Sequence, residues 1–153
     1  MESTLQKPAI AGAVISPKAE TILYWMVTVL FCLEISFTAY AQLRLPEVAQ
    51  AFAHLGFPAY FRVELSWAKL LGVMLLLAPA PVRLKEWVYA GFAINLGSAL
   101  IAHLSVGDGP EACAWAAGTS VLWGLSYWLW RRQAARASAG EAGSAGSFTK
   151  ALC

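Results

Sequence analysis

The chain has 153 residues, of which 59% are hydrophobic and 13% are charged, and its net charge is +2. Soluble domains usually carry about 25% charged residues, so this composition excludes an ordinary water-soluble enzyme and indicates a small membrane protein. The aromatic content of 12% excludes a disordered chain. A concentrated basic face is missing, which excludes a nucleic-acid partner. The three cysteines, Cys32, Cys113 and Cys153, form no CxxC pair and predict neither a disulfide framework nor a zinc site.

Four stretches are apolar enough to cross a bilayer as helices, which takes about 20 residues each. Prolines end the second stretch, and Gly107, Gly109 and Pro110 separate the third from the fourth. We therefore expect an all-α integral membrane protein, an antiparallel four-helix bundle within residues 21–132. The predicted spans are residues 21–41, 61–80, 87–104 and 112–130. Residues 1–20 are expected to form a cytoplasmic segment, and residues 133–153, rich in Gly, Ala and Ser, a disordered cytoplasmic tail.

The first span also resembles a signal peptide, because Lys18 precedes an apolar run that ends in Ala39-Tyr40-Ala41. Its basic region would be unusually long, and Glu34 interrupts the apolar run. We therefore interpret this stretch as a retained helix.

The orientation is predicted from the Lys and Arg residues outside the spans. The opposite side carries only Arg44 and Arg62, so both termini are expected in the cytoplasm. The residues on the cytoplasmic side are Lys7, Lys18, Arg83, Lys85, Arg131, Arg132, Arg136 and Lys150.

The first outer loop contains a predicted short amphipathic helix. Pro46 suits a first helical position, apolar residues recur at helical spacing from Leu45 to Leu55, and Gly56 suits the end. Two interpretations stay open for this helix: a simple connection between spans, or a gate for a substrate.

Polar side chains inside the spans are costly, so each needs a partner or a polar cavity. Glu34 and Lys69 both lie about 10 to 12 Å below the outer surface at a rise of about 1.5 Å per residue. An ion pair between them is therefore geometrically allowed, and a structural pair and a chemical role are weighed evenly. In the chemical interpretation, Lys69 positions an anionic or carbonyl group while Glu34 or His103 moves a proton.

Further polar groups accompany this set. Glu64 and Asp108 lie toward the outer surface, and with Tyr89 and Asn95 they are candidate substrate-binding residues. Metal binding is not predicted, because the histidines, His54 and His103, have no second ligand at helical spacing. For His103 taken by itself, a structural role is favoured over a chemical one.

Small and aromatic residues also form patterns. Asn95 shares a stripe with Gly91, Ser98 and Ala102, and the pairs Ala68/Gly72 and Ala114/Gly118 repeat at four-residue spacing, which favours close helix packing. Trp and Tyr residues near the cytoplasmic boundary predict an interfacial anchor belt. They are Trp87, Tyr89, Trp123, Tyr127, Trp128 and Trp130.

Several motifs occur in a recognisable order. They are Leu55-Gly56-Phe57-Pro58, the lone Lys69 in Trp67-Ala68-Lys69-Leu70-Leu71-Gly72, the run Leu84-Lys85-Glu86-Trp87-Val88-Tyr89-Ala90-Gly91, and His103 before Gly107-Asp108. With these motifs, about residues 21 to 130 resemble the DoxX-like family of small bacterial membrane proteins. The resemblance implies a four-helix inner-membrane protein. It also implies an association with membrane redox complexes, such as a thiosulfate:quinone oxidoreductase subunit.

Three functions follow as hypotheses. The chain is expected to be a subunit or accessory of a quinone-linked redox system. Its expected partner is a membrane or periplasmic redox protein, or a second copy of the chain in a homo-oligomer. It shows no CxxC, haem-ligand pair or nucleotide loop of its own, so a bound quinone or the partner would supply redox chemistry. The alternative is a small membrane enzyme that performs acid–base chemistry on a lipophilic substrate in an outward-facing polar cavity. A proton-coupled carrier has less support, because no internal repeat is evident.

Overall fold

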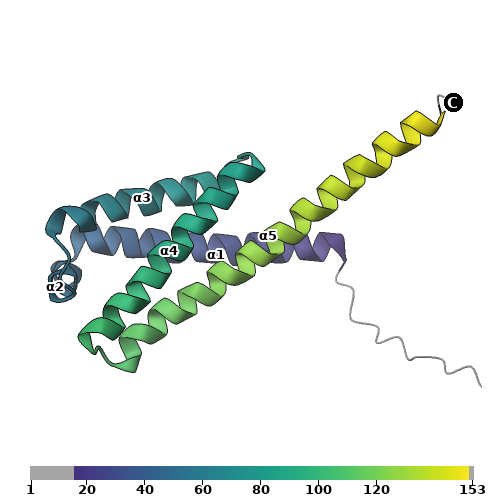
Figure 1. Cartoon of the computed structure of the whole chain (residues 1–153). Coiled ribbons are helices and arrows are strands. Elements are labelled where there is room, and N and C mark those ends of the chain that lie inside the picture. The colour runs from purple at the N-terminus through teal and green to yellow at the C-terminus, as the bar shows by residue number, and fades with distance from the viewer. Residues whose placement is uncertain (1–15, 152–153) are drawn as a thin grey trace, which may run out of the picture.

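The computed structural model describes the backbone of residues 16–151 and the side chains of residues 16–111 and 113–140. This part of the chain is all-α and contains five helices (Figure 1). Lys7 and Cys153, which enter the predictions above, lie outside the described residues. The helices are α1 (Pro17–Arg44), α2 (Pro46–His54), α3 (Ala59–Leu77), α4 (Val82–Val106) and α5 (Pro110–Ala151).

The helix boundaries follow the local chemistry of the sequence. The Ser16 side chain accepts a hydrogen bond from the Ala19 amide and caps α1. Pro46 is the first residue of α2, and Pro81 precedes α4, where a missing amide proton costs nothing. Gly56 and Gly107 adopt φ values of 80° and 74°, a left-handed conformation that ends a helix without steric cost. The predicted short helix in the first loop is confirmed as α2.

The helices alternate in direction between two ends of the molecule (Figure 1). At one end lie the start of α1, the α3–α4 connection and the C-terminal part of α5. At the other end lie α2 and the α4–α5 turn. We call this second end the α2 end. Short connections between long helices produce this antiparallel arrangement, and they bring the candidate polar residues of different helices to the same level.

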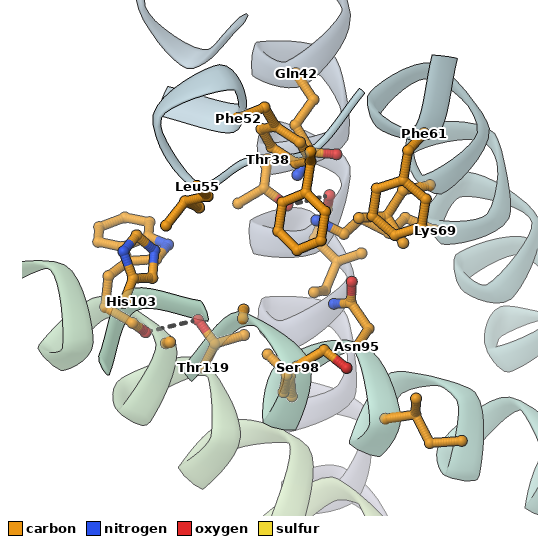
Figure 2. A pocket seen from close by; sticks show the side chains of 18 of the residues that line it. Thr38, Gln42, Phe52, Leu55, Phe61, Lys69, Asn95, Ser98, His103 and Thr119 are labelled. Atoms are coloured by element: carbon orange, nitrogen blue, oxygen red, sulfur yellow. Dashed lines mark hydrogen bonds between the residues drawn. The ribbon is translucent and has the colours of Figure 1, made fainter. Parts of the chain in front are cut away.

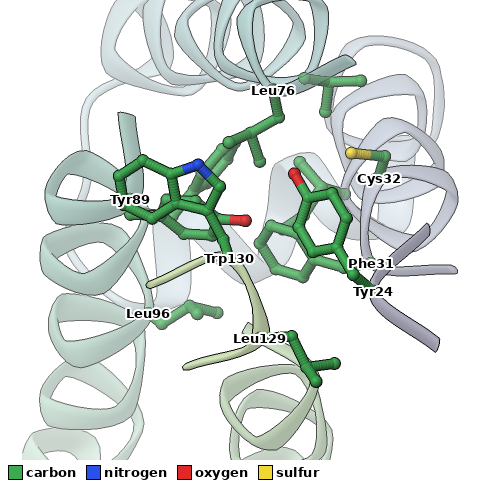
Figure 3. Packing of buried hydrophobic residues seen from close by; sticks show 11 residues of the cluster. Tyr24, Phe31, Cys32, Leu76, Tyr89, Leu96, Leu129 and Trp130 are labelled. Atoms are coloured by element: carbon green, nitrogen blue, oxygen red, sulfur yellow. The ribbon is translucent and has the colours of Figure 1, made fainter. Parts of the chain in front are cut away.

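The apolar core lies between α1, α3, α4 and α5 (Figure 3). Phe31 and Ile35 of α1 are buried there with Leu76 of α3, and the Phe31 and Phe92 rings meet edge to face at 5.2 Å. Because α1 supplies so much of this core, it is an integral part of the fold.

Two predicted anchor residues belong to this core. Tyr89 is 1% exposed and Trp130 is 7% exposed, and their rings lie 5.3 Å apart. The prediction of an interfacial role is wrong for both. The reason is helical phase: Trp87 and Trp128, two residues away, point outward and are 77% and 50% exposed.

Three hydroxyl groups inside the core form hydrogen bonds with one another. Ser126 Oγ is 2.7 Å from Thr28 Oγ1 and 2.8 Å from Tyr89 Oη, and the Trp123 indole donates to the Tyr89 carbonyl at 3.0 Å. These contacts join α1, α4 and α5 through buried polar groups, which are costly to leave without partners. Tyr89 is therefore positioned as a structural residue.

Helix α5 continues past Arg132 to Ala151, where the composition predicted disorder from residue 133 onward. Two ion pairs explain the difference over its first turns. Glu20 of α1 is 1% exposed, and it lies 3.3 Å from Arg132 Nε and 2.5 Å from Arg136 Nη1. Alanine and arginine in this segment also favour a helix, and they outweigh the lower helix propensity of its Gly and Ser residues.

The surface of the bundle is strongly apolar on all four long helices. By length and composition, two of the described helices, α1 and α4, are able to cross a membrane, where four spans were predicted. Helix α3 is 19 residues long and carries Arg62, Glu64 and Lys69, which lower its apolar character. Each long helix nevertheless exposes large apolar side chains at helical spacing: Ile22, Met26, Leu33 and Phe37 on α1, Tyr60, Trp67, Leu71 and Met74 on α3, Trp87, Ile94 and Ile101 on α4, and Trp115, Val121, Leu125 and Trp128 on α5.

Only one of the small-residue patterns produces a close helix contact. A Cβ atom added at Gly72 would lie 2.7 Å from the Phe92 ring, so α3 approaches α4 closely there. A Cβ atom at Gly91 or Gly118 would meet nothing within 4 Å. The packing prediction is therefore wrong for Gly91 and Gly118, because their positions face a cavity or the outer surface and not a neighbouring helix.

Candidate functional site

A cavity of about 500 Å³ lies between the long helices toward the α2 end (Figure 2). We call it the main cavity. Helix α1 contributes a row at positions i, i+3 and i+7, and α3, α4 and α5 contribute the other walls. Its polar side chains are Thr38, Gln42, Lys69, Asn95, Ser98, His103 and Thr119, and its aromatic ones are Phe52, Phe57, Phe61 and Trp115.

Aromatic residues cover the main cavity at the α2 end. Phe52 and Leu55 come from α2 and the residue after it, and Phe57 stacks on Phe61 with ring centroids 5.1 Å apart. The left-handed conformation of Gly56 turns the chain after α2, and Phe57, the next residue, lines the cavity. Helix α2 is therefore more than a connection, since its apolar face forms part of the cavity wall.

Lys69 is the cation of the main cavity. Its side chain lines the cavity and is 8% exposed. Among the described residues, no carboxylate lies within ion-pair distance of its ammonium group and no hydrogen-bond acceptor is recorded for it. An ammonium ion with this burial is costly to leave unpaired. The main cavity therefore presents one unsatisfied positive charge to whatever occupies it.

The ion pair between Glu34 and Lys69, allowed by their depths, is not formed. Glu34 instead accepts a hydrogen bond from the hydroxyl of Thr119 on α5. The reason is helical phase again: Ile35 and Thr38 face the cavity, while Glu34 lies one residue around α1. Glu34 is half-buried at the α1–α5 contact, and it reaches the cavity only through Thr119, which lines it.

His103 lies at the α2 end of the main cavity and is held by Asp108. Its Nδ1 atom is 2.6 Å from Asp108 Oδ2, and His54 Nε2 is 3.1 Å from Asp108 Oδ1. These hydrogen bonds, from His103 first and His54 second, hold the pKa of Asp108 below its ordinary value. The cluster connects the end of α2 to the α4–α5 turn. The link from His54 to Asp108 joins residues far apart in sequence, so spacing alone gave no signal for it.

The remaining predicted residues separate into two groups. Asn95 of α4 lines the main cavity next to Lys69 of α3, and Ser98 lies one turn further along the same face of α4 (Figure 2). Glu64 is exposed on α3 and Tyr89 is buried in the core, and neither lines the cavity. Cys32 and Cys113 are free thiols.

Several cavity residues were missed from the sequence. Thr38, Gln42 and Thr119 are uncharged, and single hydroxyl or amide groups in apolar spans are common enough to give no signal. Gln42 accepts a hydrogen bond from Ser66 at 3.1 Å and is positioned by it. The spacing of Thr38 and Gln42 on one face of α1 was the available signal, although the neighbouring Glu34 drew attention to the adjacent face.

No group of three or more His, Cys, Asp or Glu side chains suited to a metal ion occurs among the residues searched, which are those the structure describes. The polar groups of the main cavity are instead the Lys69 ammonium group, two side-chain amides, three hydroxyl groups and the His103 imidazole. Such a set can orient an oxygen-bearing group, and His103 adds a titratable nitrogen at the wall.

Comparison with known proteins adds the family. The profile of the DoxX-like family matches residues 26–125, a range that includes Lys69, Asn95, His103 and Asp108. Neither the curated proteins nor the solved structures give a match. The matched range covers well over half of the 153 residues. The protein therefore belongs to the DoxX-like family, and this membership indicates a membrane protein.

Proposed function

We propose that this protein spans an inner membrane four times and binds, in its main cavity, a lipophilic ligand whose anionic or carbonyl head group contacts Lys69. The observation that carries the proposal is the Lys69 side chain, which is 8% exposed and finds no ion-pair or hydrogen-bond partner among the described residues. An oxygen acceptor from a ligand would supply the missing partner. Asn95 adds an amide donor beside it, and the aromatic cover suits an apolar or planar group.

Four spans are supported by the outward apolar side chains of α1, α3, α4 and α5. Such continuous apolar faces would be unfavourable in water but are favoured in lipid. The bilayer then surrounds the bundle, and the ligand comes from an apolar phase.

A quinone fits this description, because its ring carbonyls accept hydrogen bonds and the rest of the molecule is apolar. We therefore keep the role of an accessory in a quinone-linked redox system as the proposed cellular context, with a membrane or periplasmic redox protein as partner. Within this chain, Lys69 and Asn95 would orient the ring oxygens, and the bound quinone would supply the redox chemistry.

The second candidate is an enzyme that moves a proton, and the His103–Asp108 hydrogen bond favours it. Asp108 holds Nδ1 of the imidazole, which leaves Nε2 as the ring nitrogen available to a ligand. In this function Lys69 stabilises negative charge on the substrate and His103 acts as the acid or base. Glu34 would act only through Thr119, as a positioning residue.

The experiment is ligand binding by purified protein in lipid nanodiscs. The probes are palmitate and a benzoquinone with a ten-carbon tail, measured by equilibrium binding. Replacing Lys69 with Met should weaken the bound probe roughly ten- to hundredfold, since a charge-assisted hydrogen bond contributes about 1.5–3 kcal/mol. Lys69→Arg should retain part of the affinity.

The matched control is Lys18→Met, because Lys18 is exposed at the start of α1, away from the main cavity. It should bind both probes like the natural protein. Equal affinity of the natural protein and folded Lys69→Met, or no binding of either probe by the natural protein, would contradict the proposal.

A further inference from the structure

A second hollow adjoins the main cavity between α3 and α4. It has a volume of about 340 Å³. We call it the α3–α4 groove. Its walls are mostly apolar and come from two helices only, with Leu65, Ala68, Leu71 and Leu75 on α3 and Leu84, Trp87 and Val88 on α4.

The two hollows meet at a shared boundary. Leu65, Lys69, Gly91 and Asn95 line both of them. The Lys69 ammonium group and the Asn95 amide therefore lie where the main cavity passes into the apolar groove. This junction places a charge at one end of an apolar path, as an amphiphile requires.

Glycine keeps the junction open. A Cβ atom added at Gly91 would meet nothing within 4 Å, so the space beside this position is unfilled. Beside the junction, Gly72 lets the Phe92 ring pack directly against α3, because a Cβ atom added at Gly72 would lie 2.7 Å from that ring. The groove therefore has a packed floor, formed by Gly72 and Phe92, and a free passage at Gly91.

The groove opens toward the lateral surface of the bundle. Trp87 and Leu71 line it and are 77% and 59% exposed, on the apolar surface that lipid would cover. From Asn95 to Leu84 the groove follows α4 for about 16 Å, and from Lys69 to Leu75 it follows α3 for about 9 Å, at a rise of about 1.5 Å per residue. This length suits an extended chain, and the direction is away from the α2 end.

We infer that the ligand is a single-chain amphiphile whose head group binds Lys69 in the main cavity while its apolar tail lies in the α3–α4 groove and reaches the lipid beside Trp87. This inference rests on the proposed function and adds the class of ligand and its route. The charge of Lys69 at the junction suits the head group, and the apolar walls of the α3–α4 groove suit the tail. The aromatic cover of α2 then faces the head group and not the tail.

The test compares two probes of one chemistry and different length, hexanoate and palmitate, in nanodiscs. Gly91→Leu fills the junction, and we expect it to weaken palmitate binding by tenfold or more, and to weaken it more strongly than hexanoate binding. Gly97→Leu is the matched control: Gly97 lies on the same helix, an added Cβ atom there also meets nothing, and it lines neither hollow. It should bind both probes normally.

Ala68→Phe provides a second obstruction, because Ala68 lines the groove but not the main cavity. It should reproduce the loss of palmitate binding even if Gly91→Leu also disturbs the binding of the head group. Equal palmitate affinity in the natural protein and folded Ala68→Phe would overturn the inference about the tail while leaving hexanoate binding, and so the proposed function, intact.

Photocrosslinking locates the tail independently. Palmitate with a diazirine near its terminal carbon should label the segments 68–75 and 84–92, and Lys69→Met should remove this labelling. Labelling of residues 46–57 instead would overturn the route. Undiminished labelling of the groove in Lys69→Met would also overturn it, because the groove would then hold any membrane chain without recognising a head group.

Discussion

At the scale of single residues, polar side chains decide the character of the site through the partners they have. Lys69 is buried and has no partner in the part of the chain that the structure describes, whereas Glu34 is bonded by Thr119 and Asp108 by two imidazoles. The difference separates the group to which we assign the ligand from groups that join helices. Charge in a span therefore identifies a functional residue only once its partners are known.

Asp108 gives a prediction about pH. Its pKa is lowered in the folded protein, chiefly by the hydrogen bond from His103. A lowered pKa means that the carboxylate stabilises the fold above its unfolded value of about 3.9, and that this contribution is lost as the pH falls through the folded value. Asp108→Asn should therefore unfold at a lower temperature than the natural protein at pH 7, and the difference should vanish in strong acid.

Thermal unfolding in detergent between neutral and acidic pH measures this effect. Glu111→Gln is the control, because Glu111 is an exposed acid three residues after Asp108 and forms no ion pair with any residue that the structure describes. It should change the unfolding temperature little at any pH. A pH-independent difference between Asp108→Asn and the natural protein would show that the carboxylate's charge does not hold the cluster.

At the scale of helices, close contacts and open positions alternate along the same elements. Gly72 brings α3 against Phe92, while Gly91, on the facing helix, leaves space that both hollows share. The sequence shows identical small residues at both positions. Only the packing of the helices distinguishes a contact from an opening.

Gly72→Ala tests the close contact. The added Cβ atom would overlap the Phe92 ring, which is itself packed edge to face on Phe31, so the ring has little freedom to move. We expect a destabilisation of about 1–3 kcal/mol, typical of overpacking, measured by thermal or denaturant unfolding in detergent.

Two variants make this result specific. Gly118→Ala lies on the outer surface of α5, where a Cβ atom meets nothing, and should be neutral or stabilising by up to about 1 kcal/mol. Phe92→Leu in the Gly72→Ala background should recover part of the stability. If Gly72→Ala were as stable as Gly118→Ala, the close approach of α3 and α4 would be contradicted.

At the scale of the whole molecule, the alternating helices place unlike surfaces at the two ends. The end with the start of α1 and the α3–α4 connection carries Glu20 with Arg132 and Arg136, and a further pair, Glu86 with Arg131. The α2 end carries the His54–Asp108–His103 cluster. The excess of Lys and Arg belongs to the first end, which we propose to be cytoplasmic.

Labelling of single cysteines tests this topology. With Cys32, Cys113 and Cys153 replaced by Ser, a cysteine at position 109 in the α4–α5 turn should react with a membrane-impermeant maleimide added to intact spheroplasts. A cysteine at position 80 in the α3–α4 connection should react only after the membrane is permeabilised. The opposite pattern would invert the proposed orientation, and equal reactivity of both sites in intact spheroplasts would contradict an odd number of crossings between them.

Much of the helical organisation was predictable from the residues. Apolar stretches, prolines and glycines located the four long helices and the short helix α2, because these signals are local and act through backbone geometry and solvation. Lys69 and His103, which the sequence singled out because ionisable groups are rare in apolar stretches, both line the main cavity. Tyr89 and Glu64 were misplaced relative to the cavity because a sequence position does not state helical phase in the assembled bundle.

What the sequence by itself determined is therefore an all-helical chain with apolar helices, a buried cation in α3 and a DoxX-like pattern of motifs. Only the tertiary structure decided that Glu34 bonds to Thr119 and not to Lys69, and that Gly91 lines two adjoining hollows. The physical reason is that rotation of each helix about its axis is fixed by packing against its neighbours. A rotation of one residue, about 100°, exchanges a core position for a cavity or a lipid-facing one.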